Sequence, residues 1–163
     1  MRATTLLGAL ATGVALLLAP AAQAAGRVEV SFKDPLNFTD IGRGPIDTER
    51  HVKLLTEHLQ ALGRRLPDDQ VLKVEVLDVD LAGTVEPMFR HREDVRVLKG
   101  STDWPVITLR YTLTAGGRTL GSGEETLKDM AYLFGLRGLR ADEPLAYDRR
   151  LLTRWFDERI LAP

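Results

Sequence analysis

The stretch W-P-V-I-T-L-R-Y-T-L-T-A-G-G-R-T-L-G-S-G-E-E-T-L, residues 104–127, decides the fold class of this chain of 163 residues. Apolar and polar residues alternate along its first half, which predicts a strand with Ile107 and Leu109 on one face. Residues 115–117, Ala-Gly-Gly, predict a hairpin loop, because glycine readily adopts a positive φ. Residues 118–127 are then expected to return as the partner strand.

Two further strands and a helix are expected before this hairpin. Alternation over residues 28–32 predicts a first strand, and residues 72–81 predict a second one whose apolar phase reverses near Leu77, as at a β-bulge. Between them, apolar residues recur at spacings of three and four from Val52 to Leu66, which indicates an amphipathic helix. We expect the carboxylate of Asp47 to cap its first turn.

The remaining chain gives weaker patterns. Residues 83–104 are expected to be mostly loop, with a short strand at residues 95–97. A last helix is expected to open at residues 142–144, Asp-Glu-Pro, because proline suits the first turn of a helix. Its apolar stripe is Tyr147, Leu151, Leu152, Trp155 and Phe156.

This order of elements predicts an α+β fold in a single domain over residues 25–163. We expect an antiparallel or mixed β-sheet with two main helices packed on one face.

The N-terminus predicts the compartment. An uncharged apolar run over residues 6–18 follows Arg2, Pro20 breaks it, and residues 22–24, Ala-Gln-Ala, form a signal-peptidase site. We therefore expect residues 1–24 to be a signal peptide and the protein to be periplasmic, with no transmembrane segment after cleavage. The alternative is a retained N-terminal anchor, although the run is shorter than the roughly 20 residues of a membrane-spanning helix.

Composition excludes several chemistries. The chain has no cysteine, which excludes disulfides, thiol catalysis and thiolate metal sites. The formal net charge is −1 with both signs mixed along the chain, so we expect no nucleic-acid partner. A protein partner in the cell envelope stays open.

Three stretches carry a family resemblance. They are residues 28–35 running into 38–40, residues 75–83, and residues 103–105, Asp-Trp-Pro, ahead of the long strand. Together they resemble the DUF3016 family of small secreted proteobacterial proteins of unknown function. The resemblance implies a periplasmic single domain and supplies no catalytic residues.

Asp78 and Asp80 are the most suggestive polar pair. Residues two apart on a strand point to the same side, so the two carboxylates could share a cation or a proton, with Glu86 a short loop away. The segment does not fit an EF-hand, because no Glu follows at the distance that an EF-hand loop requires. The alternative is a structural pair that is solvated or accepts hydrogen bonds from loop amides.

Other candidates are single residues or short motifs. His91, between two arginines, could contact an anionic ligand or belong to a solvated charge run. Trp104 could be an exposed recognition aromatic or a cap on the core. His51 and His58 lie seven residues apart on the first helix and are expected to be partly buried structural residues.

Residues 42–44, Gly-Arg-Gly, precede the first helix as in phosphate-binding loops. They lack the third glycine and the Lys-Ser/Thr signature of those loops.

The sequence thus predicts a non-catalytic binding or interaction module of the cell envelope. Its binding surface is expected at a sheet edge or in the loop over residues 83–104, and no catalytic residue, cofactor or metal is assigned. The alternative is an ion-dependent enzyme or metal-binding protein that uses Asp78 and Asp80. Asp78, Asp80, Trp104 and His91 are the candidate residues for binding a ligand or partner.

Overall fold

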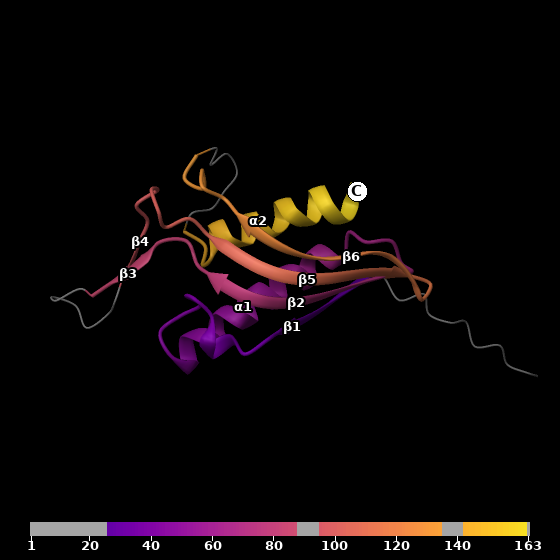
Figure 1. The fold of residues 1–163 in the computed structure, drawn as a ribbon, viewed down its shortest axis with the longest axis horizontal. Helices are drawn as coiled ribbons and strands as arrows, with labels where there is room; N and C mark the ends of the chain where they lie inside the picture. The colour runs from indigo at the N-terminus through magenta and orange to yellow at the C-terminus, as the bar shows by residue number, and fades with distance from the viewer. Residues whose placement is uncertain (1–25, 88–94, 135–141, 163) are drawn as a thin grey trace, which may run out of the picture.

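The computed structural model describes residues 26–87, 95–134 and 142–162 (Figure 1). The elements in chain order are β1 (Arg27–Phe32), the 3-10 turn η1 (Pro35–Asn37), α1 (Pro45–Gly63), β2 (Gln70–Asp80), β3 (Thr84–Glu86), β4 (Val95–Val97), β5 (Val106–Ala115), β6 (Arg118–Lys128), α2 (Ala146–Trp155) and the π-helical turn η2 (Phe156–Leu161).

Four strands form one mixed sheet in the order β1-β2-β5-β6. β1 runs parallel to β2, while β2 with β5 and β5 with β6 are antiparallel. The parallel pair is connected through α1, because parallel neighbours need a crossover. The predicted α+β class with a mixed sheet is confirmed.

The β5–β6 hairpin is built as its sequence predicts. Buried and less buried residues alternate along β5, and Ile107, Leu109, Tyr111 and Leu113 face the core. Gly116 and Gly117 form the turn with φ values of 53° and 80°, which side chains other than glycine adopt at a cost.

The predicted bulge in β2 is confirmed. The register between β2 and β5 shifts between Val76 and Asp78, so that Leu77 has no partner on β5. Beyond the bulge Val79 points into the core, with an exposed fraction of 0%. Asp78 and Asp80 consequently lie on the opposite face of the sheet, where they pair with Thr108 and Val106 of β5.

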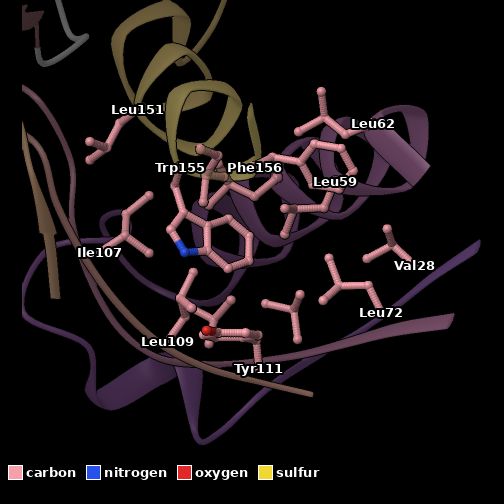
Figure 2. Packing of buried hydrophobic residues seen from close by; sticks show 14 of the residues in the cluster. Val28, Leu59, Leu62, Leu72, Ile107, Leu109, Tyr111, Leu151, Trp155 and Phe156 are labelled. Carbon is pink, nitrogen blue, oxygen red and sulfur yellow. The ribbon is translucent and has the colours of Figure 1, made fainter. Parts of the chain in front are cut away.

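Both helices cover the same face of the sheet (Figures 1 and 2). Leu59 and Leu62 of α1 and Trp155 and Phe156 from the C-terminal helical segment pack on the apolar rows of β2 and β5. Trp155 also meets Tyr111 edge-on, with ring centroids 5.7 Å apart. The apolar stripes predicted for the two helices therefore lie in the hydrophobic core.

The helix starts differ from the prediction. α1 begins at Pro45, with Gly44 as its N-cap, so Asp47 lies within the first turn instead of capping it. Gly44 has φ 84° and Pro45 takes the first helical position that proline favours. α2 begins at Ala146 after Leu145, whose φ of 55° separates the helix from Pro144.

Two short strands lie where the sequence predicts mostly loop. β4 covers the predicted strand at residues 95–97, and its antiparallel partner β3 was missed. Three residues are too few to show a period of two, which is why the pattern gave no signal for β3. A small second cluster of Ala82, Tyr132 and Tyr147 packs near this pair, with Trp104 partly buried against it.

Over the described residues, no helix is both long enough and apolar enough to cross a membrane.

Candidate functional site

The end of β2 is tied to the loop that precedes α1. Asp40 and Asp80 form an isolated parallel bridge. The Asp40 N–H donates to the Val79 carbonyl at 2.9 Å, and the Leu81 N–H donates to the Asp40 carbonyl at 2.9 Å. These bonds extend the sheet by one residue on the β1 side and fix the position of the Asp40 side chain.

Arg96 of β4 binds this same point. Its guanidinium donates to both carboxylate oxygens of Asp40, at 3.0 and 3.1 Å, and to the Gly83 carbonyl at 2.8 Å. A two-pronged bond between arginine and a carboxylate is stronger and more directional than a single contact. Arg96 therefore joins β4, the loop before α1 and the chain that leaves β2.

A cleft of about 720 Å³ opens beside Arg96. It lies where β3 and β4, the first turns of α1 and the residues before α2 meet, at one end of the molecule (Figure 1). Its lining residues are Gly42, Arg43, Asp47, Arg50, His51, Val85, Arg96, Pro144 and Leu145.

The lining of this arginine cleft is rich in positive charge. Arg43, Arg50 and Arg96 contribute three guanidinium groups to the lining; Arg50 lies 2.6 Å from the Asp47 carboxylate, and Arg96 is paired with Asp40. The side chain of Arg50 remains 62% exposed, so it can turn toward a ligand. The N-terminus of α1 adds the positive end of a helix dipole. The cleft is suited to a carboxylate or phosphate group.

His51 has a defined orientation in the cleft wall. Its Nδ1 lies 2.5 Å from the carbonyl oxygen of Ile41. A carbonyl only accepts, so Nδ1 carries the hydrogen, and in the neutral ring Nε2 is then an acceptor. The Nε2 of His51 can therefore accept a hydrogen bond from a protonated ligand group.

Two acidic groups behind Arg96 hold their protons more tightly than usual. Burial raises the pKa of the Asp148 carboxyl to about 6, although the Ala82 N–H donates to it at 3.0 Å. Burial also raises the pKa of Asp80, and the neighbouring carboxylates of Asp40 and Asp78 raise it further. Low dielectric and like charges both disfavour the ionised carboxylate.

The predicted pair Asp78 and Asp80 lies on one side of β2. The Asp78 carboxylate accepts hydrogen bonds from the Thr39 N–H at 2.8 Å and the Thr39 hydroxyl at 2.7 Å. It thus anchors the loop before α1. In the described ranges, no three His, Asp or Glu side chains are grouped so as to hold a metal ion.

The other residues singled out from the sequence lie away from the Asp78 and Asp80 pair or outside the described ranges. Trp104 is partly buried against Tyr132 and Tyr147 of the small second cluster. His91 lies outside the described residues. The expected partial burial of His51 and His58 is confirmed, and His58 Nε2 lies 2.9 Å from the Thr153 hydroxyl.

Sequence reasoning missed the arginines of the cleft. The glycine pair of residues 42–44 was the only local signal for this place. Arg96 gave none, because Asp40 lies 56 residues before it in the chain. No periodic pattern connects residues at that separation.

The fold and the cleft define a small α+β domain with a helix-covered mixed sheet and a basic cleft at one end. The family model described as "Protein of unknown function (DUF3016)" matches residues 26–158. The chain therefore belongs to the DUF3016 family. No curated protein and no solved structure matches it.

Proposed function

We propose that this DUF3016 protein is a non-catalytic binding module of the cell envelope. Its N-terminal segment would direct it to the periplasm, and the arginine cleft would hold an anionic group of its partner. The observation that carries the proposal is the convergence of Arg43, Arg50 and Arg96 with His51 on one cleft of about 720 Å³. A phosphate or carboxylate is the group that such forked donors bind best.

Part of the surface expected from the sequence belongs to this site. Val85 and Arg96, from the stretch over residues 83–104, line the cleft. The alternative function, an ion-dependent enzyme using Asp78 and Asp80, has less support, since Thr39 already engages both oxygens of Asp78.

The first test is capture of envelope proteins by the chain from residue 25 onward, alone and with inorganic phosphate or citrate as competitor. A double variant, Arg43→Glu with Arg50→Glu, reverses charge in the cleft and leaves the Arg96 bonds in place. Arg64→Glu with Arg118→Glu is the matched control, because both arginines are exposed and lie outside the cleft lining.

We expect the cleft variant to lose at least about tenfold in affinity, equivalent to about 1.4 kcal/mol, while the control keeps its affinity. Phosphate or citrate should compete with the wild-type chain. Equal loss in both variants would indicate nonspecific charge attraction, and unchanged capture by the cleft variant would contradict the assignment of this site.

Secretion is tested separately. We expect the full chain to be released by osmotic shock with a mature N-terminus at Ala25. Retention in the membrane fraction at full length would support the retained anchor.

A further inference from the structure

A second concave surface lies between β6 and the C-terminal helical segment. It consists of two adjacent clefts, of about 240 and 380 Å³, and Arg159 lines both of them. We call them together the β6 groove. It is distinct from the arginine cleft, with which it shares no lining residue.

β6 carries glycine at two core-facing positions, and one of them, Gly121, leaves space open in the larger cleft. Gly121 pairs with Leu113 and Gly123 pairs with Tyr111, so no β6 side chain covers these two residues from that side. A Cβ placed on Gly121 would meet no atom within 4 Å. Tyr111 and Leu113, only 8% and 7% exposed, form one wall of the larger cleft, and the Tyr111 ring fills the space over Gly123, 3.2 Å from a Cβ placed there.

Trp155 supplies an unused donor at the smaller cleft. Its side chain is 4% exposed, and its Nε1 is buried without a hydrogen-bond partner. Figure 2 shows this nitrogen on the side of the ring that faces Ile107 and Leu109. Their partners on β6 are Leu127 and Glu125, which line the smaller cleft together with Trp155. An indole N–H can only donate, and leaving it unpaired in the interior is unfavourable because the donor loses its hydrogen bonds to water.

The two ends of the groove differ in polarity. Lys128, Arg154 and Arg159 lie at the smaller cleft with Glu125 and Glu158, and Arg159 pairs with Glu125 at 2.7 Å. Lys128 has no ion-pair partner in the part of the chain that the structure describes. The larger cleft is walled mainly by apolar side chains, including Leu113, Leu120 and Leu161.

We propose that the β6 groove binds an acyl chain that ends in a carboxylate. A carboxylate oxygen accepts the Trp155 N–H and lies near Lys128, while the hydrocarbon chain runs past Arg159, which lines both clefts, to the open space at Gly121 in the apolar cleft. Such a ligand satisfies the buried donor and covers apolar surface that Gly121 leaves open.

Octanoate is the probe, with octanamide as the uncharged analogue of the same length. The binding partner is the isotope-labelled chain from residue 25 onward, which contains the whole described core. The readout is the indole N–H resonance of Trp155, assigned by its loss in Trp155→Phe and compared with that of Trp104. We expect octanoate to shift the Trp155 resonance saturably, and octanamide to bind at least tenfold more weakly.

Two substitutions test where the hydrocarbon chain of octanoate binds. Gly121→Leu fills the larger cleft and should weaken octanoate binding at least tenfold with the fold intact, because the new side chain enters open space. Ser122→Leu is the matched control, since it adds the same side chain on the opposite face of β6 and should leave binding unchanged.

Three outcomes would overturn the proposal. An unshifted Trp155 resonance at saturating octanoate would exclude the indole as a ligand donor. Equal losses of octanoate affinity in Gly121→Leu and Ser122→Leu would place the hydrocarbon chain outside the β6 groove. Equal affinity for octanoate and octanamide would remove the requirement for a carboxylate.

Discussion

Arg96 makes several hydrogen bonds to distant parts of the chain, and the sequence around it does not predict them. One guanidinium binds the Asp40 carboxylate and the carbonyls of Leu81 and Gly83, and it also forms part of the wall of the arginine cleft. All five hydrogen bonds of this guanidinium go to protein groups, and 23% of the Arg96 side chain remains exposed. Replacing Arg96 would remove structural hydrogen bonds and a cleft-lining charge at once, so the binding test uses Arg43 and Arg50 instead.

Asp148 gives a pH-dependent prediction. Its pKa is about 6 in the folded chain, against 3.8 as the ordinary value, so the folded state holds the proton more tightly than the unfolded state. Its stability contribution is therefore complete below about pH 4 and is lost as the pH rises through 6. The expected loss is on the order of 3 kcal/mol.

The measurement is urea unfolding of the wild type and Asp148→Asn at pH values from 4 to 8. Asparagine keeps an oxygen for the Ala82 N–H and has no charge, so the wild type should lose stability relative to it as the pH rises. Asp68→Asn, at an exposed position, is the control. Parallel curves for the wild type and Asp148→Asn would contradict the prediction.

The pair Asp78 and Asp80 illustrates how far single residues can be interpreted from sequence. Their common side of the strand followed from the period of two, and it persists because both lie beyond the bulge at Leu77. The two Thr39 hydrogen bonds could not be foreseen, since Thr39 is 39 residues away. The hydrogen-bond partner of the Asp78 side chain therefore depends on how distant segments pack.

At the scale of elements, the β3–β4 pair positions the cleft. Gly83 stands directly before β3 with φ 85°, and its N–H donates to the Asp103 carbonyl at 2.8 Å. A Cβ at this position would lie 2.7 Å from the Val97 carbonyl oxygen. The close approach of two backbones therefore requires glycine here, independently of the strand pattern.

Gly83→Ala should destabilise the chain by at least about 2 kcal/mol, by adding a backbone clash to the strain of a positive φ. Gly116→Ala separates the backbone strain from the clash, because Gly116 also has a positive φ, of 53°, but has open space around it. It should cost about 1 kcal/mol. Urea unfolding of both variants measures the difference, and equal losses would show that the contact with Val97 is unimportant.

At the scale of the whole molecule, one core joins the first and last helical segments. Leu59 of α1 and Phe156 at the start of η2 both have an exposed fraction of 0% and lie side by side over the sheet (Figure 2). Apolar residues of β1, β2 and β5 complete the same cluster. No half of the described chain encloses this core alone, so we expect unfolding to be cooperative.

Leu59→Ala and Phe156→Ala should each lower stability by about 2–5 kcal/mol and shift one common transition. Leu36→Ala, at a side chain that is 62% exposed, is the control and should stay within about 0.5 kcal/mol. Circular dichroism and tryptophan fluorescence followed in the same urea titration provide the check. Separate midpoints for the two probes would indicate two unfolding units.

The sequence by itself determined the elements whose signal is local. The period of two in residues 106–113, the glycines at 116 and 117 and the apolar stripe of α1 each depend on neighbours within a turn or a strand, and all three were predicted correctly. The α+β class follows from their order, because each apolar face must be buried against another element.

Only the tertiary structure decided the two clefts. The arginine cleft forms where Arg43 before α1, Arg50 of α1 and Arg96 of β4 come together. The β6 groove forms where α2 and η2 lie beside β6. These neighbours are distant in the chain and share no period. Their meeting depends on sheet order, on the bulge in β2 and on helix packing, which are fixed only when the whole core assembles.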